Sequence, residues 1–153
     1  MADNTNILDF NQQFLGAKVK KTGTQALTSG VSAIVTFDSE IFDDGGWHDN
    51  VTNNSRLTVP EGVSKIILTA SIELTASAGG NHRAFFFLQN NVTTIESASS
   101  PNAFGTSLNN VYTIQSMPIE VVEDDYLEIA ANVDTAGISV LSNSYFSAYA
   151  VQF

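Results

Sequence analysis

Cysteine is absent from this sequence, and basic residues are scarce. The lack of cysteine excludes a disulfide framework, a zinc–cysteine centre and a thiol nucleophile. The sequence contains 6 Lys and Arg residues and 16 Asp and Glu residues, which gives a net charge of −10. This charge disfavours direct binding to nucleic acid or to an anionic membrane. No apolar run approaches the roughly 18 residues that a membrane-spanning helix needs. The composition therefore favours a globular chain that folds by burying a hydrophobic core.

The first ten residues, MADNTNILDF, lack the basic and then apolar pattern of a signal peptide. We therefore expect the protein to stay in the cell that makes it or to leave inside a larger particle. The length of 153 residues predicts one folded domain, which we place at 14–153. Residues 1–13 are interpreted as an N-terminal arm. Its apolar residues Ile7, Leu8 and Phe10 are candidates for docking onto a partner, and the alternative is a frayed end.

Helical periodicity is also missing, whereas alternation of apolar and polar residues is frequent. Residues 64–74 are the clearest case, with Ile66, Leu68 and Ile72 on one face and Thr69 and Glu73 on the other. Further strand patterns follow at intervals of roughly 8–12 residues, separated by turn clusters. The pattern predicts an all-β fold, a two-sheet antiparallel jelly-roll sandwich.

The longest interruption runs from Phe37 to Gly62 and carries many acids. Calcium takes six to eight oxygen ligands, so this loop is a calcium candidate. The alternative is a set of solvated surface carboxylates. No other cofactor is expected. The proposed calcium ligands are Asp38, Asp43, Asp44 and Asp49.

The only tryptophan, Trp47, lies in the same loop, and Phe104 is the large apolar residue of a later polar loop. Both are candidates for contacting a ligand such as a glycan, since aromatic faces suit sugar rings. The alternative for Trp47 is a plug at the end of the sandwich or at a subunit junction.

Catalytic patterns are weak. His48 and His82 are the only histidines, and no Gly-x-Ser-x-Gly elbow accompanies them. We therefore expect a protein that is not an enzyme.

The order of several short motifs carries more information than any one of them. An apolar-x-Phe-Asp step at Val35–Asp38 precedes a Gly-aromatic-x-Asp loop at Gly46–Asp49. A Leu-Thr-x-Pro-x-Gly turn follows, then the alternating strand, an acidic turn, and a final strand that reads SYFSAYAVQF. In this order the sequence resembles the C1q/TNF-like jelly roll over residues 14–153. The variant is most similar to stand-alone or fibre-tip domains of bacterial viruses.

This resemblance implies a homotrimer in which three sandwiches pack about a three-fold axis. Outer aromatic residues would then be buried between subunits. The candidates for this interface are Phe85, Phe87, Tyr112, Tyr145, Tyr149 and Phe153.

The function we expect is that of a structural protein at the surface of a virus particle, a trimeric decoration or cement protein on a phage head. Its partner would be a viral capsid or tail protein. The alternatives are a receptor- or glycan-binding tip module of a phage tail fibre and a bacterial C1q-like adhesive protein.

Overall fold

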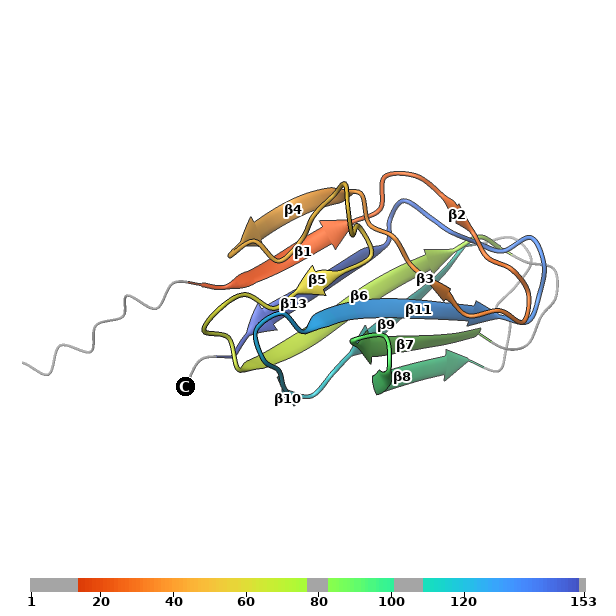
Figure 1. The fold of residues 1–153 in the computed structure, drawn as a ribbon. Helices are drawn as coiled ribbons and strands as arrows, with labels where there is room; N and C mark the ends of the chain where they lie inside the picture. Colours follow the sequence, from red (N-terminus) through yellow and green to blue (C-terminus); the bar gives the residue numbers. More distant parts are fainter. Residues whose placement is uncertain (1–13, 77–82, 101–108, 152–153) are drawn as a thin grey trace, which may run out of the picture.

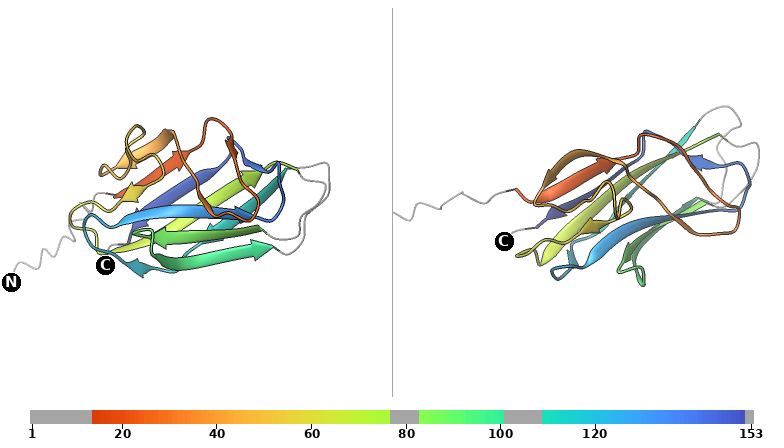
Figure 2. Two further views of the ribbon diagram at one scale, coloured as in Figure 1. Left: turned by 45° about the vertical axis from the view of Figure 1, so that its right-hand side comes forward. Right: turned by 45° about the horizontal axis from the view of Figure 1, so that its top comes forward.

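The fold consists of two antiparallel β-sheets packed face to face (Figure 1), as seen in a computed structural model that describes residues 14–76, 83–100 and 109–151. Within these residues no helix is long and apolar enough to cross a membrane. The all-β, two-sheet prediction is confirmed. Figure 2 shows that the two sheets run alongside one another over most of their length.

The larger sheet centres on β6 (Lys65–Leu74), the strand whose alternation is clearest in the sequence. Its path of hydrogen-bonded neighbours runs β2-β12-β6-β13-β1-β4, and β9 and β10 pair with β6 as well. The other strands of this sheet are β1 (Gly16–Lys20), β2 (Gln25–Ala26), β4 (Ser39–Asp44), β9 (Asn110–Gln115), β10 (Ile119–Glu120), β12 (Ser139–Val140) and β13 (Tyr145–Ala150).

The smaller sheet has the order β3-β11-β7-β8, and β5 also pairs with β11. Its longest strand is β11 (Tyr126–Val133), the second segment with regular alternation. The remaining strands are β3 (Ala33–Ile34), β5 (Leu57–Thr58), β7 (Arg83–Gln89) and β8 (Thr93–Ser100).

β8 continues to Ser100, through a segment of Ser and Ala residues that carries little strand signal. The register of β8 with β7 continues to the pair Arg83↔Ser100. Cross-strand hydrogen bonding therefore keeps this Ser- and Ala-rich segment extended, although its apolar content is low.

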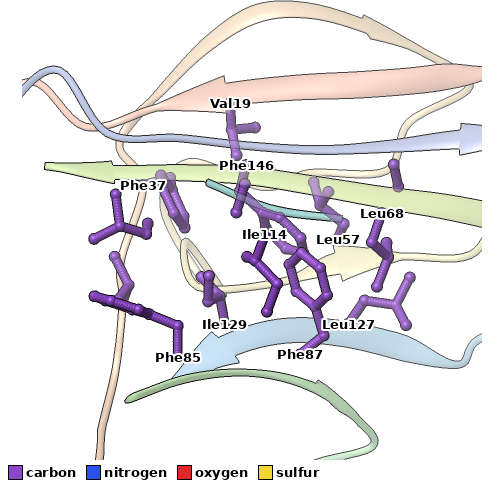
Figure 3. Close-up of a cluster of buried hydrophobic side chains, with 14 of the residues drawn as sticks. Val19, Phe37, Leu57, Leu68, Phe85, Phe87, Ile114, Leu127, Ile129 and Phe146 are labelled. Atoms are coloured by element: carbon purple, nitrogen blue, oxygen red, sulfur yellow. The ribbon is translucent and has the colours of Figure 1, made fainter. Parts of the chain in front are cut away.

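The core lies between the sheets (Figure 3). Phe37, Phe85, Phe87 and Phe146 are fully buried there together with aliphatic side chains from both sheets. The ring centres of Phe87 and Phe146 are 5.7 Å apart, so stacked aromatic rings join β7 of one sheet to β13 of the other. Burial of this apolar surface is the main source of stability in a chain without disulfides.

The turns that join the strands use residues suited to positive φ. The turn Gln89–Val92 is closed by a hydrogen bond from the Val92 amide to the Gln89 carbonyl (3.1 Å). Asn90 and Asn91 have φ of 53° and 55°, as a type I′ turn requires. In the acidic turn, Asp124 adopts φ of 68°, a conformation that glycine usually supplies.

Candidate functional site

The acidic loop that follows β4 is closed by its own side chains. The carboxylate of Asp43 accepts hydrogen bonds from the amides of Trp47 (2.8 Å) and His48 (3.1 Å). The indole N–H of Trp47 donates to the carbonyl of Asp44 (3.1 Å), and Gly45 and Gly46 have φ of 120° and 73°. The two glycines allow the tight turn, and Asp43 then holds its backbone amides in place.

Trp47 itself is buried, with 1% of its surface exposed. Its ring therefore presents no free face on which a sugar could stack. The position fits the interpretation of Trp47 as a plug, and we do not retain it as a ligand anchor.

The other candidate acids are also engaged locally. Asp38 accepts from the Thr22 amide (2.6 Å) and the Thr22 hydroxyl (2.7 Å), and Asp49 accepts from the amides of Val51 (2.8 Å) and Thr52 (3.0 Å). Burial alone would raise the pKa of Asp38, but the Thr22 hydrogen bonds and the charge of Lys21 outweigh it and lower the pKa.

These hydrogen bonds bear directly on the calcium site that the sequence suggested. Within the three described stretches of the chain, no three His, Asp or Glu side chains are grouped so that they could hold a metal ion. Asp38, Asp43 and Asp49 each serve a separate turn, and Asp44 is exposed. The structure thus does not assemble the four carboxylates as one site.

His48 packs inside the loop, and its side chain is 1% exposed. Its ring nitrogens lie 3.2 Å from Glu40 Oε1 and 3.4 Å from the Asn54 carbonyl oxygen. Glu40 also accepts from the Asn50 side chain (2.7 Å). This arrangement links β4 to the turn at 51–55 and gives His48 a structural role.

The aromatic residues proposed for a trimer interface fall into different places. Phe85 and Phe87 are 0% exposed and lie in the core, which corrects the expectation that they form an outer aromatic face. The alternation of β7 directs them toward the larger sheet. Tyr112 also packs toward the core, with its ring 4.9 Å from that of Phe85.

Tyr145 and Tyr149, in contrast, lie on the far side of the larger sheet. Their neighbours Phe146 and Ala148 are fully buried between the sheets, so alternation directs the two tyrosines outward. Lys18 of β1 places its ammonium 4.9 Å from the centre of the Tyr145 ring. Phe153, Phe104, His82 and the arm residues Ile7, Leu8 and Phe10 lie outside the described residues.

The outward positions of the neighbouring strands β13, β6 and β9 form one surface, which we call the uncharged face. The register of β6 pairs Ile67 with Tyr149 and Ser71 with both Tyr145 and Thr113. The positions that we include are uncharged, and charged residues adjoin them on the same side of the sheet. Glu73, opposite Val111, is 8% exposed, and Lys18 of β1 lies opposite Ser147. The uncharged face consists of Ile67, Thr69, Ser71, Val111, Thr113, Gln115, Tyr145, Ser147 and Tyr149.

An aromatic cluster that sequence reasoning did not identify adjoins the uncharged face. The ring of Phe14 lies 5.8 Å from Phe42 and 5.9 Å from Tyr149, and Phe14 remains 54% exposed. Gly16 lies beneath these rings, and a Cβ atom there would come within 2.7 Å of the Ala148 carbonyl oxygen. The spacing Phe14, Gly16, Lys18 on one strand face was the available signal, but it became informative only once the pairing of β1 with β4 and β13 was known.

The two antiparallel sheets match the C1q/TNF type of jelly roll, as the similarity to solved structures shows. No protein-family model matches the sequence, and no curated protein sequence matches it. Among solved structures, the globular domain of zebrafish complement 1qA is similar with a TM-score of 0.64 and 11% identity, covering 92% of this chain and 98% of that chain.

Two TNF-family structures are similar to the same extent. Eiger TNF from S. frugiperda has a TM-score of 0.61 and 10% identity, covering 91% of this chain and 93% of that chain. Murine APRIL has a TM-score of 0.66 and 6% identity, covering 91% of this chain and 100% of that chain. The chain thus has the C1q/TNF jelly-roll fold along nearly all of its length.

Proposed function

We propose that this chain is a non-enzymatic structural module that assembles as a homotrimer through its uncharged face. The observation that carries the proposal is that face itself. Ile67, Val111, Tyr145 and Tyr149 expose apolar surface across adjacent strands, interspersed with hydroxyl and amide side chains. The charged residues beside them are the buried Glu73 and Lys18, whose ammonium lies over the Tyr145 ring. A charge-depleted patch with aromatic residues is typical of a subunit interface.

The likeness to the C1q/TNF fold supports the choice of three subunits, because that resemblance implies packing about a three-fold axis. The aromatic cluster of Phe14, Phe42 and Tyr149 extends the apolar surface to the edge strand β4. A second subunit that covers both regions would bury the exposed ring of Phe14. Sedimentation of the purified chain tests the assembly.

We propose further that the trimer is located on the surface of a virus particle, as a decoration or cement protein on a phage head. The order of motifs along residues 14–153 supports this, as does the position of a polar arm with three apolar residues ahead of β1. Binding across neighbouring capsid subunits would stabilise the shell because it favours the assembled state.

The test uses purified virus particles from the native source. We expect mass spectrometry to detect the chain in the particles and immuno-gold labelling to place it on the head. Deletion of residues 1–13 should abolish attachment while leaving the trimer intact. Absence of the chain from the particles contradicts the viral role but not the trimer.

A further inference from the structure

A groove opens at the end of the sandwich where β6 begins and β13 ends, at the left in Figure 1. The Val151 amide donates to the Lys65 carbonyl (2.8 Å), and the Val121 amide donates to the Ser64 carbonyl (3.1 Å). The groove has a volume of about 420 Å³ and lies between the larger sheet and the end of β7. It is lined by Ser64, Lys65, Gln89, Glu120, Val121, Val122 and Asp125.

The base of this groove is held by Asp125, which is 9% exposed. Its carboxylate accepts from the side chains of Gln89 (2.7 Å) and Asn90 (2.7 Å) and from the Val122 amide (3.0 Å). Burial would raise the pKa of Asp125, but these hydrogen bonds outweigh it and lower the pKa. Both carboxylate oxygens already accept hydrogen bonds from the protein, so Asp125 fixes the shape of the groove. A bound ligand would be recognised by the residues at the rim of the groove.

The rim offers uncovered aliphatic surface. Val122 is 66% exposed, whereas its neighbour Val121 is 5% exposed and forms part of the floor. Val92, in the turn that directly follows Gln89, is 84% exposed. Asn90 of that turn accepts from the Tyr126 amide (2.9 Å), so the turn is tied to the segment that carries Val122.

The charge at this end is predominantly negative. Glu61, Glu120, Glu123 and Asp124 are exposed in the turns that border the groove, and the side chain of Glu120 is 87% exposed. Lys65 is the basic residue of the lining, and its ammonium lies 3.9 Å from Glu120 Oε1. An acidic segment, a nucleic acid or an anionic membrane would be repelled here, whereas a basic group would be attracted.

We propose that this groove is a docking site for a partner protein segment in which a Lys or Arg flanks an aliphatic residue. The aliphatic side chain covers Val122 and the floor at Val121, and the basic group meets Glu120 and Glu123. The groove lies at the same end of the sandwich as Leu15, whose carbonyl accepts from the Ala150 amide (2.9 Å). The inference rests on the proposed role as a structural protein that attaches to another protein, and it holds whether the chain is a monomer or a trimer.

The test uses the full chain and three fluorescent hexapeptides, in which leucine alternates with lysine, serine alternates with lysine, or leucine alternates with glutamate. We expect fluorescence anisotropy at physiological salt to detect binding of the lysine–leucine peptide. Val122→Ser should weaken that binding by about tenfold, as loss of an apolar anchor does. Glu120→Gln should weaken it by about two- to fivefold, as loss of an exposed ion pair does. Val31→Ser and Asp44→Asn, at exposed positions elsewhere, should change it less than about twofold.

Equal binding of the lysine–serine peptide would overturn the proposal, since attraction to the net charge alone would explain it. Equal weakening by the two control variants, or no binding of any peptide, would overturn it as well. Amide chemical shifts of residues 64–66 and 119–125 should move with the lysine–leucine peptide, and shifts confined to other residues would contradict the location. Sedimentation of the same samples reports the trimer separately, so failure of the groove and failure of the assembly are distinguishable.

Discussion

Ile67 of β6 and Tyr149 of β13 lie directly opposite one another in an antiparallel register, and both point away from the smaller sheet. Each is only partly buried within the single chain. Such a cross-strand pair stabilises the sheet locally, but its outward surface remains free for another subunit. The pair lies at the end of the uncharged face that adjoins the cluster of Phe14 and Phe42.

Ile67→Lys should dissociate the trimer without unfolding the subunit. A lysine here would be buried without a partner in the assembly, which typically costs about 2–5 kcal/mol, or roughly 30- to 4,000-fold in affinity. Gel filtration with light scattering measures the change, and circular dichroism checks the fold. Thr113→Lys should act in the same direction, and Val31→Lys, exposed on a loop, should have no effect.

Trp47→Ala should destabilise the subunit by about 3–5 kcal/mol, because it removes a large side chain that is 1% exposed. Urea unfolding followed by circular dichroism measures the loss. Trp47→Phe keeps part of the volume and should cost clearly less. A Trp47→Ala variant as stable as the wild type would show that the indole is not packed as described.

Asp43→Ala should cost about 1–3 kcal/mol, because the amides of Trp47 and His48 lose their shared acceptor. Asp44→Ala is the matched control, since Asp44 is an exposed acid one residue away. Both free energies of unfolding can be measured in urea. Equal values for the two variants would contradict the assigned role of Asp43 in closing the loop.

Gly16→Ala should destabilise by about 1–3 kcal/mol, because the new Cβ atom would lie 2.7 Å from the Ala148 carbonyl oxygen and against the rings of Phe14 and Tyr149. Gly23→Ala provides a control, since no atom lies within 4 Å of a Cβ there. Thermal unfolding compares the two variants. A neutral Gly16→Ala would show that β1 and β13 are less closely packed than described.

Acid should destabilise the protein partly through Asp125, whose folded-state pKa is lowered. A lowered pKa means that the folded state binds fewer protons than the unfolded state. Its contribution is therefore complete above the unfolded value of about 3.9 and is lost as the pH falls through the lower folded value. Asp125→Asn should be less stable than the wild type near neutral pH, and the difference should shrink as the pH falls below the unfolded value of about 3.9. Urea midpoints across this range measure it, and a difference independent of pH would contradict the assignment.

Much of the fold could be predicted from sequence because alternation in 64–74 and 126–133 reflects burial directly. The motif order around Phe37 and the Leu57–Gly62 turn then indicated the jelly-roll type. The placement of aromatic residues was harder to predict. Phe85 and Phe87 read as outer residues because the run RAFFFLQ is apolar on both faces, and only the packing of β7 against the other sheet shows which face is internal.

The loop acids illustrate the same limit. Their number indicated a metal site. Each carboxylate instead accepts hydrogen bonds from backbone amides of a nearby turn, and the spacing of residues in the sequence does not determine the geometry of that turn. The groove at the end of β6 had no sequence signal, because Lys65, Gln89 and Val122 come together only through the pairing of distant strands.

Sedimentation equilibrium of the purified wild-type chain at micromolar concentration tests the central claim most directly. The account predicts a single species with three times the 16.4 kDa mass of one chain. A species that remains at 16.4 kDa over that concentration range would contradict the assignment of the uncharged face as a subunit interface.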